Sequence, residues 1–245
     1  MIEAVLFDMD GTLLDIDFGG FLDAYMKAAV ARFHDVGPAE EVARQLVAST
    51  VAMIQNKEPG RTILDAFIDD FFPALGLPKE EIQRFMAFYR EDYPALHYWA
   101  RPMDGAREIL QAAFDRGYKV AIATAPLFPR EAIWERLRWG KVDDFPYDFV
   151  AGADVLHIAK PFPGYYLEIA EKLGVAPEAC LMIGDELEMD GHAARVGMRT
   201  LLVGPDRPSN MELWFAGQVP APEAQVPRYP DLHELRRALQ EEGIL

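Results

Sequence analysis

The chain has 245 residues, of which 51% are hydrophobic and 26% charged, proportions typical of a globular protein. Its 24 basic and 40 acidic residues give a formal net charge of −16, which argues against a surface for nucleic acid or anionic membranes. The length allows one large domain, or a core domain with a smaller insertion.

We expect a cytoplasmic protein. The single cysteine, Cys180, excludes an internal disulfide and fits a reducing compartment. Glu3 and Asp8 interrupt the first apolar run, so no signal-peptide pattern is expected there, and no apolar stretch is long enough to span a bilayer.

The first apolar run, AVLF at residues 4–7, predicts a short, fully buried parallel strand. Asp8 and Asp10 follow it two positions apart, so their side chains point to the same side if the strand geometry continues. Gly11 then allows a sharp turn. Two carboxylates at one strand end repel each other unless a cation lies nearby or one binds a proton. The alternative is a polar turn without chemistry, since Asp and Gly are common turn formers.

The next segment predicts helices only. Apolar residues recur at helical spacing over 18–33 and 63–75, and weaker patterns cover 42–54 and 82–93. The breaks contain glycine and proline, at 37–38, 59–60 and 76–78. We therefore expect an all-helical block over residues 15–97 with no strand in it.

Helices and strands alternate after residue 102. The pattern predicts strands at 120–123, 148–150, 180–183 and 200–203, and helices at 106–116, 129–139, 165–173, 190–196 and 232–239. This alternation is typical of a parallel sheet covered on both faces, to which the first strand also belongs. We expect an α/β protein with a Rossmann-like parallel sheet core, formed by residues 1–14 and 98–245, and an inserted all-helical domain at 15–97.

Besides the two aspartates after the first strand, polar residues follow two more of the predicted strands or precede a helix at the same edge. They are Thr124 after the second strand, Lys160 before the helix at 165, and Asp185 with Asp190 after the strand at 180–183. Each has an ordinary explanation alone, as a cap, a solvated ammonium or a turn. Ligands of open α/β sheets bind at the carboxyl ends of the strands, however, so together these residues predict one site.

Four segments resemble the signature segments of the haloacid dehalogenase superfamily. They are DMDGT at residues 8–12, Thr124, Lys160-Pro161, and GDELEMD at residues 184–190, in the correct order and spacing. Residues 160–175 and 190–198 resemble the phosphatase and phosphosugar mutase branch. The resemblance identifies the helical block with the superfamily's cap.

The resemblance implies a Mg²⁺ site with Asp8, Asp185 and the Asp10 backbone carbonyl as ligands. Hard oxygen ligands suit Mg²⁺, which offsets the repulsion between a carboxylate nucleophile and a phosphoryl group. Asp8 would attack phosphorus and form an aspartyl phosphate, and Asp10 would act as general acid and base. Lys160 would contact both the nucleophile and the phosphate.

The Thr124 hydroxyl would donate to a phosphoryl oxygen, and Asp190 and Glu186 would belong to the acidic metal loop. An acid at position 10 favours phosphoryl transfer, since displacement of halide needs no protonated leaving oxygen. Two features depart from the family: Ala125-Pro126 follows Thr124, where a small polar residue is usual, and Glu186 adds a negative charge.

The predicted function is hydrolysis of a small phosphorylated metabolite. A phosphomutase of the same superfamily and a catalytically weakened phosphate-binding module stay open as alternatives. A receiver-type signalling domain also uses Asp, Thr and Lys at sheet edges, but it has no long helical insertion after its first strand.

Four further positions are less decisive. Tyr25, Lys57 and Arg61 could contact substrate from the cap, although a solvated face is the simpler explanation, and His192 is expected on a helix surface rather than as a ligand. Trp214 and its neighbour lie in a proline-rich stretch and could pack on the core or on another subunit.

Overall fold

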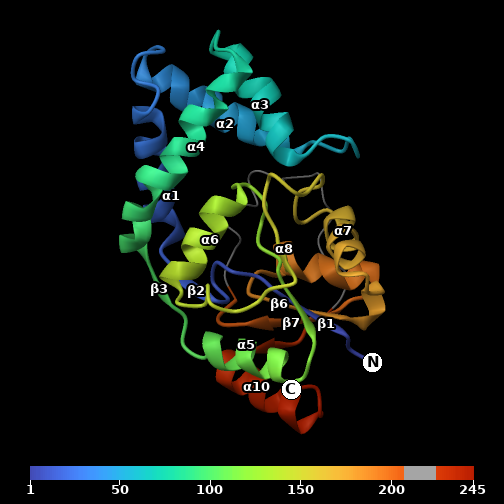
Figure 1. Cartoon of the computed structure of the whole chain (residues 1–245). Helices are drawn as coiled ribbons and strands as arrows, with labels where there is room; N and C mark the ends of the chain where they lie inside the picture. The colour runs from blue at the N-terminus through green and yellow to red at the C-terminus, as the bar shows by residue number, and fades with distance from the viewer. Residues whose placement is uncertain (207–224) are drawn as a thin grey trace.

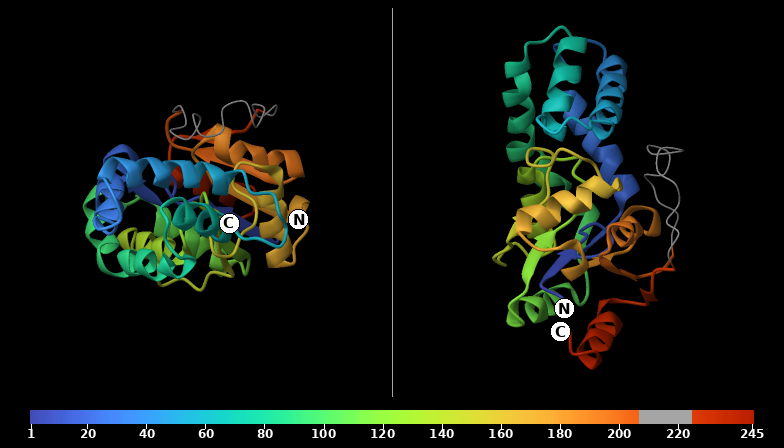
Figure 2. Two further views of the ribbon diagram at one scale, coloured as in Figure 1. Left: turned by 90° about the horizontal axis from the view of Figure 1, so that it is seen from above. Right: turned by 90° about the vertical axis from the view of Figure 1, so that its right-hand side faces the viewer.

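The computed structural model describes residues 1–206 and 225–245. A parallel sheet flanked by helices forms one part of the molecule, and a bundle of helices stands above it (Figures 1 and 2). Both chain ends lie at the side of the sheet remote from this bundle (Figure 1). No helix in the described ranges is both long and apolar enough to cross a membrane. The expectation for Trp214 and Phe215 falls outside the described residues.

The main sheet has six strands in the order β5-β4-β1-β6-β7-β8, and every neighbouring pair is parallel. The strands are β1 (Ala4–Phe7), β4 (Lys119–Ile122), β5 (Phe149–Val150), β6 (Cys180–Gly184), β7 (Arg199–Val203) and β8 (Arg228–Tyr229). All four residues of β1 are buried, as a strand with neighbours on both edges and helices on both faces requires. The predicted α/β class with a Rossmann-like parallel sheet is confirmed.

Helices connect the parallel strands and follow the last one. The connecting helices are α5 (Ala106–Asp115), α6 (Arg130–Trp139), α7 (Pro163–Leu173) and α8 (Leu187–Asp190), with short 3₁₀ helices η3 (Pro177–Ala179) and η4 (Gly191–Val196), and α10 (Leu232–Glu241) comes after β8. Right-handed crossovers put connections that run in opposite directions along a sheet on opposite faces. The helix α5 leads outward to β4, whereas α7 leads back to β6, so both faces are covered.

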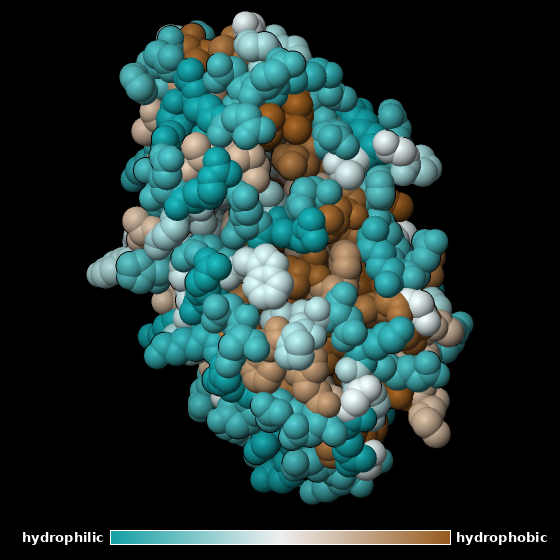
Figure 3. All heavy atoms as spheres, in the orientation of Figure 1, coloured by the Kyte–Doolittle hydropathy of each residue, from teal (hydrophilic) through white to brown (hydrophobic). Residues whose placement is uncertain are grey.

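The helical insert comprises α1 (Phe18–Ala31), α2 (Ala39–Ile54), α3 (Ile63–Ala74), η1 (Lys79–Glu81), α4 (Ile82–Glu91) and η2 (Tyr93–Trp99). Its interior is aromatic: Phe33 and Phe85, for example, both contact Phe71 at centroid distances of 5.4 and 6.2 Å. On the face drawn in Figure 3, hydrophilic residues prevail, and hydrophobic residues show through in separate patches, several of them near the middle of the view.

The insert leaves and rejoins the sheet through an antiparallel pair, β2 (Leu14–Ile16) and β3 (Ala100–Pro102). The expectation that residues 15–97 contain no strand was therefore wrong at 15–16. A three-residue strand is too short for apolar alternation to reveal, and its partner lies 86 residues further along the chain.

A second difference concerns residues 190–196, where we expected a helix. The structure has one α-helical turn ending at Asp190, followed by the 3₁₀ helix η4. Apolar spacing over so few residues does not separate the two helix types. Gly197 ends η4 in a left-handed conformation with φ 89°, which favours glycine.

Candidate active site

The turn after the central strand carries two carboxylates. The Asp8 amide donates to the Ile183 carbonyl at 2.8 Å, which continues the β1 to β6 pairing by one residue. Gly11 has φ 89°, and a Cβ added there would lie 2.1 Å from Asp185 Oδ2. The glycine is thus required twice, by its backbone conformation and by the side chain that packs against it.

Lys160 is buried and joins three groups. Its Nζ lies 2.7 Å from Asp8 Oδ1 and 2.5 Å from Asp190 Oδ1, and it donates to the Ala123 carbonyl at 3.0 Å. Burial alone would lower the pKa of Lys160, but the Asp190 and Asp8 carboxylates outweigh it and raise that pKa well above its usual value. The ammonium is therefore a fixed positive charge beside Asp8.

Asp190 organises the loop after β6. Its Oδ2 accepts hydrogen bonds from the backbone amides of Asp185 and Glu186 at 3.1 and 3.0 Å. A Cβ on Gly184 would lie 2.0 Å from the Asp190 carboxyl carbon, so only glycine fits beneath this side chain. Since Lys160 contacts the other oxygen, both Asp190 oxygens already interact with protein groups.

Three carboxylates, those of Asp8, Asp185 and Asp190, offer oxygens that all lie within 4.8 Å of one another. Burial, followed by the charges of Asp190 and Glu186, raises the pKa of Asp185 to about 8. Burial also raises the pKa of Asp8, an effect that Lys160 opposes and the neighbouring aspartates reinforce. Such crowding of acidic groups is unfavourable without a cation, and oxygen ligands of this kind suit Mg²⁺. The cluster fits a metal site.

The second carboxylate of the turn, Asp10, has a partner that sequence reasoning missed. Arg136 of α6 donates through Nη1 to Asp10 Oδ2. Burial raises the pKa of Asp10, and Arg136 opposes this without cancelling it. The signal lay in the helical spacing: Arg136 shares the buried face of Ala132, Ile133 and Leu137, a position where an apolar residue is expected.

Thr124 follows β4 and is buried at the same edge. Its carbonyl accepts a hydrogen bond from the Tyr165 hydroxyl at 2.8 Å, which connects the end of β4 to α7. Together with the Ala123 carbonyl on Lys160, this fixes the position of the strand end that faces Asp8.

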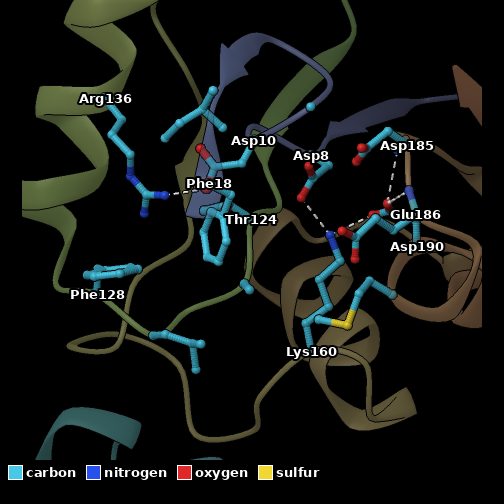
Figure 4. A pocket seen from close by; sticks show the side chains of 15 residues that line it. Asp8, Asp10, Phe18, Thr124, Phe128, Arg136, Lys160, Asp185, Glu186 and Asp190 are labelled. Atoms are coloured by element: carbon cyan, nitrogen blue, oxygen red, sulfur yellow. Dashed lines mark hydrogen bonds and ion pairs between the residues drawn. The ribbon is translucent and has the colours of Figure 1, made fainter. Parts of the chain in front are cut away.

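These side chains meet at one cavity of about 330 Å³ (Figure 4). All five residues singled out from the sequence border it, namely Asp8, Asp10, Thr124, Lys160 and Asp185. The cavity also has an apolar side, to which Ile16, Phe18, Leu127, Phe128 and Met189 belong. It can therefore hold a small molecule with a charged group at the aspartates and a short carbon skeleton beside the aromatic rings.

Two minor expectations were wrong. His192 is 2% exposed, so it is not a surface residue. Tyr25 does not belong to a solvated face either, because it is buried and its hydroxyl lies 2.9 Å from that of Tyr89. Arg61 pairs with Asp69 at 3.2 Å within the insert.

The fold and site together define an α/β protein with an acidic site at the carboxyl ends of its parallel strands. A family model for haloacid dehalogenase-like hydrolases matches residues 2–197, and the chain belongs to this family. It is 31% identical over 196 residues to a phosphoglycolate phosphatase of Rhodospirillum rubrum, covering 76% of this chain and 72% of that protein.

Solved structures agree on the fold. The structure of a haloacid dehalogenase family phosphatase from Thermococcus onnurineus matches with a TM-score of 0.58 and 22% identity, covering 97% of this chain and 98% of that one. The L-2-haloacid dehalogenase from Xanthobacter autotrophicus matches with a TM-score of 0.55 and 22% identity, covering 98% and 99%. At these identities the likeness concerns the fold, and the chemistry has to be argued from the site.

Proposed function

We propose that the protein is a Mg²⁺-dependent phosphatase that hydrolyses a monoester of a small phosphorylated metabolite through an aspartyl phosphate on Asp8. The observation that carries the proposal is the pairing of two carboxylates with different surroundings at one turn. Asp8 lies 2.7 Å from the buried Lys160 ammonium and belongs to the acidic cluster with Asp185, whereas Asp10 lies outside that cluster and pairs with the Arg136 guanidinium. A carboxylate beside an ammonium and a metal-type cluster suits a nucleophile, and a second carboxyl on the same turn suits the proton transfers to and from the leaving oxygen.

In the first half of the reaction, an Asp8 oxygen attacks phosphorus while the bond from phosphorus to the ester oxygen breaks. Asp10 gives its proton to the departing alcohol, which leaves as a neutral molecule. Lys160 lies beside Asp8 and balances negative charge as the phosphoryl group arrives. The Thr124 hydroxyl donates to a phosphoryl oxygen.

In the second half, Asp10 takes a proton from water as the water oxygen attacks phosphorus. The bond between phosphorus and Asp8 breaks, inorganic phosphate leaves, and both carboxyl groups return to their starting states. Asp8 and Asp185, with the Asp10 backbone carbonyl, would hold Mg²⁺, which supplies charge neutralisation at the phosphoryl oxygens. The helical insert acts as a cap that excludes water and selects the leaving group.

Turnover of p-nitrophenyl phosphate tests the proposal. We expect Mg²⁺-dependent release of phosphate that is abolished in Asp8→Asn. Asp104→Asn is a matched control, since that side chain is 95% exposed and outside the cavity lining. Undiminished turnover by Asp8→Asn, or full activity in chelator, would reject the mechanism. A panel of phosphorylated metabolites, read for free phosphate and for isomerised product, separates a phosphatase from a mutase.

Isotope labelling in H₂¹⁸O adds a second test. Attack of water on phosphorus puts ¹⁸O into the released phosphate and leaves Asp8 unlabelled. A dehalogenase-type ester would instead be hydrolysed at the aspartate carbonyl carbon, with ¹⁸O appearing in the Asp8 carboxylate. Mass spectrometry of the peptide that contains Asp8, after many turnovers, distinguishes the two.

A further inference from the structure

One edge of the Arg136 guanidinium is buried without a hydrogen-bond partner. The side chain is 1% exposed, and Nη1 donates to Asp10. Nε and Nη2 donate to no group in the part of the chain that the structure describes. A buried donor without an acceptor is destabilising, and more so when it is charged, so a purely structural role does not account for an arginine here.

Aromatic rings surround this guanidinium instead of acceptors. Its central carbon lies 4.7 Å from the centroid of Phe128 and 5.8 Å from that of Phe21. Ring faces attract the cation but accept no strong hydrogen bond. Among the described residues, two other buried polar atoms, Asp10 Oδ1 and the Tyr93 hydroxyl, also have no hydrogen-bond partner, and both side chains interact electrostatically with Arg136. Of these three residues, Asp10 and Arg136 line the cavity.

The two unpaired nitrogens form the side of the guanidinium that binds a planar oxyanion best. Nε and Nη2 donate in parallel, so a carboxylate can accept both hydrogen bonds at once while Nη1 stays on Asp10. Arg136 borders the same cavity as Asp8 and Lys160. Figure 4 shows Arg136 and Lys160 at opposite sides of the site, with Asp8 and Asp10 between them.

We propose that Arg136 binds a second anionic group of the substrate, a carboxylate on the alcohol that leaves. The substrate class is then a phosphate ester of a short hydroxy acid, and this inference rests on the proposed function. The phosphoryl group occupies the end with Asp8 and Lys160, and the carboxylate occupies the end with Arg136. The cavity of about 330 Å³ suits a short carbon chain between them.

The charges favour a carboxylate over a second phosphate. Five acidic residues line the cavity against two cations, and Lys160 is already paired with two aspartates. When Asp10 holds the proton that it donates to the leaving group, the single positive charge of Arg136 neutralises a monoanion but not a dianion. Because Nε and Nη2 have no exposed surface, the carboxylate reaches them when the Phe128 or Phe21 ring moves aside.

Matched esters test this site. The pairs are carboxymethyl phosphate with carbamoylmethyl phosphate, and 2-carboxyethyl phosphate with 2-carbamoylethyl phosphate, which differ only in carboxylate against amide. For the wild type we expect kcat/KM to favour the carboxylate by about tenfold or more in at least one pair. In Arg136→Gln the ratio falls to about one, and in Arg136→Lys, which keeps the charge but loses the planar edge, it lies between.

The ratio of kcat/KM for a carboxylate ester to that for its amide separates binding of the carboxylate from effects on the reaction itself. Arg136 also contacts Asp10, so Arg136→Gln lowers turnover of every ester, and p-nitrophenyl phosphate measures that shared loss. Arg138→Gln is the control on the same helix, because its side chain is 59% exposed and pairs with Glu135. We expect its ratio to equal that of the wild type. A wild-type ratio near one for both pairs, or an unchanged ratio in Arg136→Gln, would overturn the inference.

A binding measurement keeps the inference separate from the proposed function. Calorimetry on Asp8→Asn compares the affinities of the same esters without turnover, with and without Arg136→Gln. If the wild type hydrolyses none of the esters, nor p-nitrophenyl phosphate, the phosphatase proposal fails, while the carboxylate-to-amide affinity ratio still decides the role of Arg136. If Arg136→Gln does not fold, Arg136→Lys and the wild-type ratio decide it.

Discussion

Removal of the buried Lys160 ammonium tests whether it compensates the negative charges of Asp8 and Asp190. In Lys160→Met the side-chain length is nearly kept, but Asp8 and Asp190 lose their partner at 2.7 and 2.5 Å, and the Ala123 carbonyl loses its donor. Breaking a buried pair by removing one partner costs about 3–5 kcal/mol, because a charge is left buried and uncompensated. We expect a loss of unfolding free energy in that range in metal-free buffer.

The pH dependence gives a second, independent readout. Burial already raises the pKa of Asp8, and loss of Lys160 raises it further. A carboxyl whose pKa is higher in the folded than in the unfolded state binds more protons when folded, so the free energy of unfolding falls as pH rises above about 4. The deficit of Lys160→Met should therefore be larger at pH 8 than at pH 5.

Urea denaturation followed by circular dichroism, in chelator at both pH values, measures these effects. Lys172→Met is the control, since that ammonium is 32% exposed and lies 3.5 Å from Glu168 in an i,i+4 pair. Exposed pairs of this kind contribute about 0.3–0.5 kcal/mol. If Lys160→Met loses less than about 1 kcal/mol, or loses no more than the control, then Lys160 does not compensate buried charge and the reasoning is wrong.

Three further predictions concern the reaction and the metal. Asp10→Asn should lower kcat by about 10²–10⁴ for an alkyl phosphate but much less for p-nitrophenyl phosphate, whose leaving group needs no proton; equal losses on both would contradict general acid catalysis. Gly11→Ala should lose both stability and Mg²⁺ affinity, because its Cβ meets Asp185. The control is Gly76→Ala, where φ is 69° and no atom lies within 4 Å, so that only stability should fall. Unfolding and Mg²⁺ titrations measure the two effects. Mg²⁺ at about 100 times its dissociation constant should add about 2.7 kcal/mol to the unfolding free energy, and an unchanged melting temperature would argue against a resident metal.

The sequence predicts most strands of the main sheet, because each buried strand is a short apolar run that neighbouring residues alone reveal. The apolar runs at β1, β4, β6 and β7 are short and continuous, as strands buried on both faces are, and the intervening helices end at glycines in left-handed conformations such as Gly174 and Gly197. The strands β2, β3 and β8 escape prediction because two or three residues carry too little pattern.

The candidate site residues that follow a strand could be proposed from the sequence, whereas for Arg136 the helical spacing indicates only a buried position and not what it contacts. Asp8, Thr124 and Asp185 are placed by parallel strand ends that meet at one edge. Arg136 reaches the same cavity from the middle of α6, among charged residues typical of a solvated helix. Its role depends on how α6 packs against the turn after β1, which is tertiary information.

The contact between Asp8 and Lys160 joins positions 152 residues apart, and it forms beside a strand that needs β4 and β6 on its two edges. Contacts between positions so far apart in the sequence carry a large loop-closure cost and slow folding. During refolding, we therefore expect hydrolytic activity to appear after helix formation. We expect the site to become active only when β1, β4 and β6 are paired and Lys160 has reached Asp8.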